Sequence, residues 1–153
     1  MRMISRLIEI RFRTVQNWVV ANRLHYWQTQ FQTARRPVLD NLEKVVDLLD
    51  FIRYEQREHF VCITVDAANR VIARRVVSVG TLTSSLVHPR EVFVDAITDR
   101  AVAIIVAHNH PGDSPPSQID LDTTARLKEA GKLLGIELLD HLIISPKSYV
   151  SIL

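Results

Sequence analysis

The sequence of 153 residues contains a single cysteine, Cys62, which lies within an apolar run. One cysteine cannot form an internal disulfide, so a reducing compartment is consistent, and we expect the thiol to be buried and inert. No apolar stretch is long enough to span a bilayer, and the N-terminus lacks the apolar core and small-residue cleavage site of a signal peptide. We therefore expect a cytoplasmic protein without a membrane partner.

Acidic residues are nearly absent from residues 1–36, which hold seven arginines and one carboxylate, Glu9. The formal charge of this segment is +6, against +2 for the whole chain, so the remaining residues carry −4. Its apolar residues recur roughly at helical spacing, which predicts a basic amphipathic helix. Two interpretations stay open: a strip that attracts the phosphates of nucleic acid or an acidic partner, or an extension that packs on the domain or has little order.

The boundary of the main domain is predicted at Pro37, because proline disfavours helix at the residue before it. We divide the chain into a basic segment, residues 1–36, and one domain, residues 37–153. The composition, with 47% hydrophobic and 24% charged residues, is that of an ordinary globular protein. The patterning of this domain predicts helices at residues 40–52, 89–99 and 117–134, a hairpin of strands at 60–65 and 71–79, and strands at 101–110, 136–145 and 149–153. The sequence thus predicts an α/β domain with a mixed β-sheet flanked by helices.

The most informative stretch follows the run AVAIIVA at residues 101–107, which is typical of a strand buried on both faces. His108 and His110 continue that strand, and residues two apart in an extended segment point to the same side. Four residues of the next six are proline or glycine and turn the chain. Ser117 then opens a helix, and Asp120 lies in its first turn, within reach of the histidines.

Two imidazoles and one carboxylate provide three protein ligands and leave a fourth position for water, as in catalytic zinc sites. Such a site activates water. Ser117 and Asp120 also match a capping box variant, and a histidine pair at a strand end is by itself a weak signal. The combination favours a metal, with no cysteine nearby to indicate another metal chemistry. We predict one Zn²⁺ per chain, bound by His108, His110 and Asp120.

These motifs also carry a family resemblance. HNHP followed by S-x-x-D resembles the His-x-His and Ser-x-x-Asp signature of JAMM (MPN-plus) metalloproteins, in particular their RadC-like branch. The resemblance covers about residues 37–153 and includes the segments RPVLDNLEKVV, REHFVCITVDAANRVI, VGTLTSSLVHPREVF and LLDHLIIS. The family usually has seven residues between the second histidine and the serine, whereas residues 111–116 supply six. The resemblance implies a three-layer, deaminase-like fold.

The resemblance also implies two catalytic residues. Glu58, directly before a β-prone run, matches the glutamate that acts as general base, and Ser117 matches the serine that supports the oxyanion. Glu91 competes with Glu58, but its expected place in the first turn of a helix favours a dipole-stabilising role. Asn109 points to the face opposite the histidines and is predicted to be structural.

Asp140 and His141 interrupt an apolar segment and allow two interpretations. A metal-bound imidazole usually donates its second N–H to a neighbouring group, and one of these residues is a candidate for that partner. The interpretation we favour from the sequence is a hydrogen-bonded pair within the core.

Three functions are consistent with these patterns. The leading prediction is a JAMM-type zinc hydrolase, a peptidase or isopeptidase with a peptide or protein substrate. The second is a nucleic-acid-processing or DNA-repair-associated protein, which the resemblance to RadC-like proteins implies and residues 1–36 permit, although no helix-hairpin-helix pattern precedes the domain. The third is a non-catalytic protein-binding module.

Overall fold

The computed structural model of this chain describes residues 29–30, 36–80 and 87–153. Its elements are, in chain order, β1 Thr29–Gln30, α2 Leu42–Leu49, the 3-10 turn η2 Asp50–Ile52, β2 Glu58–Val65, β3 Val71–Gly80, α3 Pro89–Thr98, β4 Ala103–Asn109, α4 Gln118–Leu134, β5 Glu137–Ile144 and β6 Tyr149–Ser151.

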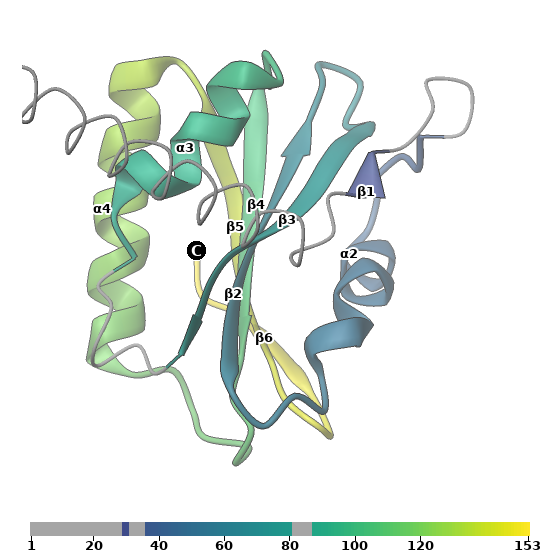
Figure 1. Cartoon of the computed structure of the whole chain (residues 1–153), viewed down its shortest axis with the longest axis vertical. Helices are drawn as coiled ribbons and strands as arrows, with labels where there is room; N and C mark the ends of the chain where they lie inside the picture. Colours follow the sequence, from purple (N-terminus) through teal and green to yellow (C-terminus); the bar gives the residue numbers. More distant parts are fainter. Residues whose placement is uncertain (1–28, 31–35, 81–86) are drawn as a thin grey trace, which may run out of the picture.

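The strands form a six-stranded sheet in the order β1-β3-β2-β4-β5-β6. Only the β4–β5 pair is parallel among the strands of the described residues, and α4 connects these two strands. Figure 1 shows α2 on one face of the sheet and α3 with α4 on the other. The fold is therefore the predicted three-layer α/β arrangement with a mixed sheet.

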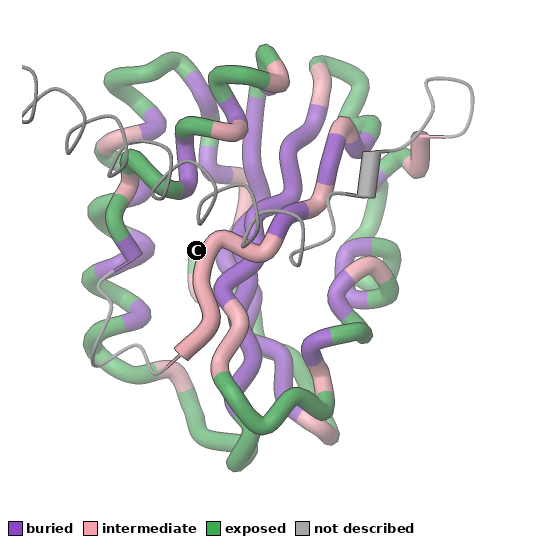
Figure 2. Tube along the Cα trace, viewed as in Figure 1, coloured by how far each residue is buried: buried purple, intermediate pink, exposed green. Residues whose placement is uncertain are grey.

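Two hydrophobic cores lie on opposite faces of this sheet, because successive strand side chains alternate between the faces. The first packs α2 against one side, and the second packs α3 and α4 against the other. All seven residues of β4 are buried, as expected for a strand covered on both faces, and Figure 2 shows the buried residues concentrated in the central strands. Cys62 belongs to the second core, and burial raises the pKa of its thiol to about 12. The thiol is thus buried, as predicted, and protonated.

The predicted element boundaries agree closely with the structure. The helix expected at residues 40–52 begins at Leu42, because Asn41 caps it, and ends in the tighter turn η2. The hairpin, the proline-initiated α3 and the end of α4 at Gly135, whose φ is +67°, are confirmed.

Most of the predicted basic segment lies outside the described residues. Thr29 and Gln30 form the edge strand β1 and pair with Arg74 and Ala73 of β3. Most of the predicted amphipathic helix in residues 1–36 falls on residues that are not described, as does most of the loop predicted after Gly80. The boundary at Pro37 stays a prediction.

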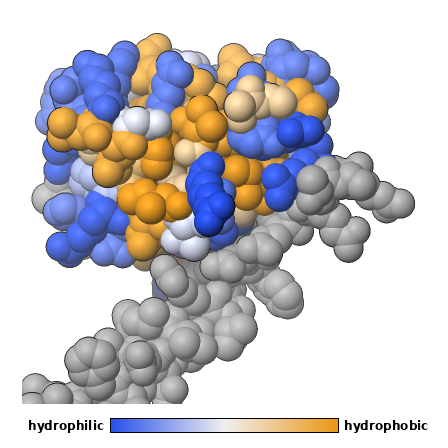
Figure 3. All heavy atoms as spheres, turned by 90° about the horizontal axis from the view of Figure 1, so that it is seen from above, coloured by the Kyte–Doolittle hydropathy of each residue, from blue (hydrophilic) through white to orange (hydrophobic). Residues whose placement is uncertain are grey.

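One end of the sheet carries exposed apolar side chains. Figure 3 shows apolar residues gathered on the face seen from above. At this end, where α3 and α4 finish and β4 begins, Ile97, Val102, Leu133 and Leu134 are exposed. The histidines lie at the other end of β4. Across the described ranges, no helix has both the length and the apolar character required to cross a membrane.

Candidate metal centre

The end of β4 and the start of α4 bring His108, His110 and Asp120 together. The Nε2 atoms of the two histidines lie 3.0 Å apart. Oδ1 of Asp120 lies 3.1 Å from His108 Nε2, and Oδ2 lies 3.6 Å from His110 Nε2. The three residues are buried, with exposed fractions of 0% for His108, 7% for His110 and 1% for Asp120. Residues that are twelve positions apart in the chain therefore form one cluster.

The two oxygens of Asp120 have different surroundings. Oδ2 accepts hydrogen bonds from the backbone N–H and the hydroxyl of Ser117, each at 2.7 Å. Ser117 Oγ in turn lies 3.3 Å from the backbone N of Asp120, which completes a capping box at the N-terminus of α4. Oδ1 is buried and has no hydrogen-bond partner. The capping box and the predicted ligand role therefore use different oxygens of one carboxylate.

His110 is fixed by the loop that follows it. Its backbone N–H donates to the carbonyl of Ile144 at 2.8 Å, which extends the β4–β5 ladder by one residue. Its ring Nδ1 lies 2.8 Å from the carbonyl oxygen of Ser114. Because a carbonyl only accepts, Nδ1 carries the proton, and the lone pair of Nε2 is directed toward His108 and Asp120. The loop of six residues holds this geometry although it is one residue shorter than the family pattern.

The cluster gathers acceptor atoms without enough donors to match them. An imidazole nitrogen and an unpartnered buried carboxylate oxygen face a second imidazole, and buried polar atoms require a partner. A proton or a cation placed among these atoms would supply the missing partner. Two ligands at about 2.0–2.1 Å from a tetrahedral ion lie about 3.3 Å apart, close to the observed 3.0–3.6 Å. These residues fit a divalent metal such as zinc.

The environment keeps Asp120 ionised. Burial raises its pKa, but the adjacent His108 and the hydrogen bonds from the N–H and hydroxyl of Ser117 outweigh burial and hold the pKa well below its usual range. Its position in the first turn of α4 also favours negative charge. A permanently charged carboxylate is the form that a metal ligand requires.

His141 lies directly behind His108. Its Nε2 is 2.9 Å from His108 Nδ1, and its Nδ1 is 2.6 Å from the hydroxyl of Thr124. Burial first, and then the nearby His108, lower the pKa of His141 to about 3. Asp140 accepts from the backbone N–H of His141 at 2.7 Å and from the hydroxyl of Ser151. The hydrogen bond expected within this pair thus joins the backbone of His141 to Asp140, which is only half-buried, while the ring of His141 takes the other role considered for these residues, as a partner of His108.

Asn109 lies between the histidines and points away from them, as predicted. Its Oδ1 accepts from the backbone N–H of His59 at 2.7 Å. Its Nδ2 donates to the carbonyls of Glu55 and Arg57, each at 3.1 Å. The buried amide thus holds the backbone on both sides of Glu58 against the end of β4.

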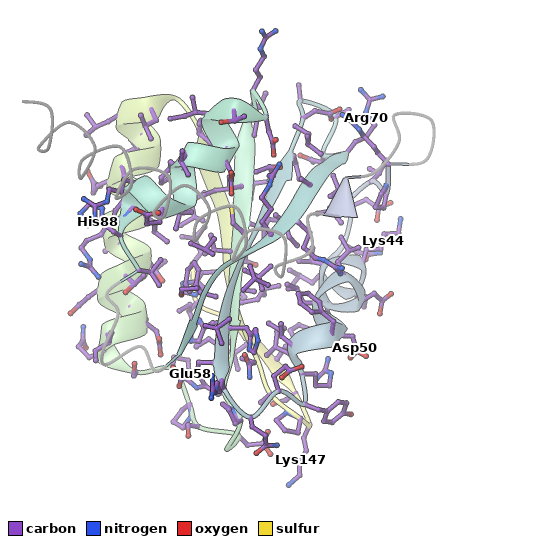
Figure 4. The ribbon with its side chains drawn as sticks, in the orientation of Figure 1. Lys44, Asp50, Glu58, Arg70, His88 and Lys147 are labelled. Carbon is purple, nitrogen blue, oxygen red and sulfur yellow. The ribbon has the colours of Figure 1, made fainter. Side chains whose placement is uncertain are left out.

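Glu58 begins β2, at the end of the sheet where β4 finishes (Figure 4). Two residues later, Phe60 pairs with His108, and the two rings stack with centroids 6.0 Å apart. Residues two apart on a strand share a face, so Glu58 leaves β2 on the face that carries His108. Its side chain is half-buried.

A scan against family models matched the RadC-like JAB domain over residues 39–153, three quarters of the chain. This chain belongs to the RadC-like JAB domain family. A UPF0758 protein of Pelobacter propionicus is 45% identical to this JAB domain chain over 128 residues, which are 80% of this chain and 56% of the relative. A UPF0758 protein of Bacillus licheniformis is 50% identical over 106 residues, which are 69% of this chain and 47% of the relative. UPF0758 protein YsxA of Bacillus subtilis is 49% identical over 106 residues, which are 69% of this chain and 46% of the relative. The chain spans about half the length of these relatives.

In this JAB domain, the predicted catalytic residue Ser117 and the competing glutamate Glu91 differ in their hydrogen-bond partners. Ser117 is exposed, and its hydroxyl proton is directed at Asp120, so an oxyanion role would require the hydroxyl to turn away from the cap. Glu91 is exposed in the first turn of α3, with one oxygen 3.1 Å from Arg90 Nε, which fits the predicted helix-terminal role. The catalytic roles of Glu58 and Ser117 stay predictions. Sequence reasoning did not find Thr124, whose only local signal is its place one helical turn after Asp120.

Proposed function

We propose that this chain is the JAB domain of a zinc-dependent hydrolase that cleaves peptide or isopeptide bonds. The observation that carries the proposal is the buried, unpartnered Oδ1 of Asp120, which faces His108 and His110. The three residues would hold one zinc ion and leave a coordination position open. When bound, zinc would polarise a carbonyl group and increase the acidity of water.

The remaining steps belong to side chains near the ligands. Glu58 lies on the face of the sheet that carries His108 and would take a proton from the attacking water and return it to the leaving amine. Ser117 lies at the exposed edge of the cluster, where its hydroxyl would stabilise the developing oxyanion after leaving Asp120. Because Ser117 is exposed and Glu58 is half-buried, we expect a peptide to approach the buried ligands past these residues.

The test separates a base from a ligand. Glu58→Gln preserves shape but cannot accept a proton, so this variant should retain zinc and lose hydrolysis by about 10²–10⁴-fold. Asp120→Asn should lose zinc itself, and Glu91→Gln is the matched control at an exposed helix terminus. Zinc content and turnover are measured for all variants on a panel of peptides and isopeptides. Full activity of Glu58→Gln with loss in Glu91→Gln would reverse the assignment, and absence of turnover in the zinc-loaded parent would favour a binding module.

Nucleic acid is the second candidate partner. The charge of +6 in residues 1–36 favours it, because arginine-rich segments bind phosphates without requiring a specific sequence. This binding would be additional to the zinc chemistry of residues 37–153 and would decrease with salt.

A further inference from the structure

We propose that Thr124 and His141 set the position of the proton on His108, so that the Nε2 lone pair of His108 faces the metal cluster. This inference rests on the proposed zinc site but concerns two residues that are not ligands. The two act through His108 and are positioning residues.

The hydroxyl of Thr124 determines the direction of the chain of hydrogen bonds. Its Oγ1 lies 2.7 Å from the carbonyl oxygen of Asp120 and 2.6 Å from His141 Nδ1. A hydroxyl has one proton, and a carbonyl can only accept. If the proton pointed to His141, two acceptor oxygens would face each other at 2.7 Å. Both contacts are hydrogen bonds only when Thr124 donates to Asp120 and His141 Nδ1–H donates to Thr124.

The same logic continues through His141 to His108. A neutral imidazole with its proton on Nδ1 has a lone pair on Nε2. His141 Nε2 therefore accepts from His108 Nδ1, which lies 2.9 Å away. His108 then has its proton on Nδ1, and its Nε2 is left facing His110 and Asp120. Both histidines of the cluster thus present the same nitrogen, with the Nδ1 proton of His108 held by the buried His141 and that of His110 by the carbonyl of Ser114.

The chain of bonds also connects the elements that carry the ligands. His108 is on β4, His141 on β5, and Thr124 lies one turn after Asp120 on α4. The ring of Phe60 stacks on His108 and meets His141 edge-on at 5.6 Å, which limits rotation of both imidazoles. The turn of α4 that supplies the carboxylate therefore also anchors the histidine opposite it. Outer partners of metal-bound histidines typically change metal affinity by about 10–100-fold when they are removed.

The first test uses the metal-free, ¹⁵N-labelled full chain. Long-range ¹H–¹⁵N spectra distinguish a protonated ring nitrogen from one with a lone pair. We expect protonated Nδ1 atoms on both His108 and His141. A lone pair on His108 Nδ1 would overturn the inference, and this result does not depend on whether zinc binds.

The second test measures zinc affinity by competition with a chelator. Thr124→Val keeps the shape of the side chain and removes the acceptor for His141, so zinc should bind about 10–100-fold more weakly. Thr124→Ser retains the hydroxyl and should bind like the parent protein. Equal affinity in Thr124→Val and the parent would contradict the inference, whereas failure of the parent to bind zinc would contradict the proposed function. Melting curves of the metal-free variants show whether each variant is folded. If Thr124→Val is unfolded, the ¹H–¹⁵N spectra of the metal-free parent decide whether the inference holds.

Discussion

Asn109→Ala is expected to destabilise the protein and displace Glu58 without removing a metal ligand. The substitution deletes three hydrogen bonds, one from the N–H of His59 and two to the carbonyls of Glu55 and Arg57. At about 0.5–1.5 kcal/mol each, these bonds contribute about 1.5–4.5 kcal/mol. The three backbone groups are only partly buried, and water can replace the amide, so we expect a loss near 2 kcal/mol.

The assay combines urea unfolding with amide hydrogen exchange. The N–H of His59 loses its acceptor in Asn109→Ala and should exchange faster, while amides in the centre of β4 should change only with global stability. Asn41→Ala is the control, because it removes the single cap of α2 and costs about 1 kcal/mol without affecting His59. An unchanged unfolding free energy in Asn109→Ala, or unchanged protection of His59, would refute the role of this amide.

Three further predictions concern other parts of the chain. Burial raises the pKa of Asp99, but the hydrogen bonds from Arg75 lower it more, so the folded-state pKa lies below the unfolded one. The stabilisation by this pair is therefore present above about pH 3.9 and lost as pH falls through the folded-state pKa. Asp99→Asn should cost about 3–5 kcal/mol at neutral pH and flatten the acid limb of a stability curve. Gly131→Ala should destabilise by about 1–3 kcal/mol in thermal unfolding, because the new methyl group meets the carbonyl oxygen of Ile136, and a gain in stability would show that the turn relaxes. A protein truncated to begin at Arg36 should keep its circular dichroism spectrum and zinc but lose any salt-sensitive affinity for nucleic acid; an unfolded product would place the domain boundary earlier.

Local patterns were sufficient to predict most of the fold. The run before His108 predicted a strand buried on both faces, and Ser117 with Asp120 predicted the start of α4, because alternation and capping are properties of adjacent residues. The approach of Asp120 to the histidines followed from the short loop between them. The family resemblance then indicated the three-layer arrangement.

Contacts between distant strands could not be predicted in this way. His141 reaches His108 because β5 lies beside β4 in a parallel register with an irregularity between Ile104 and Ile105. The partners of Asn109 depend in the same way on how β2 meets β4. A shift of one residue in either register would turn these side chains to the other face, and no local pattern specifies such a shift.

The most direct test of the metal centre is zinc stoichiometry, measured by elemental analysis after the protein is stripped with a chelator and reloaded. The parent protein should bind one zinc per chain, and His108→Ala should bind none, because it leaves only two of the three ligands of the cluster. Stoichiometric zinc in a variant that lacks both His108 and His110 would contradict the proposed site.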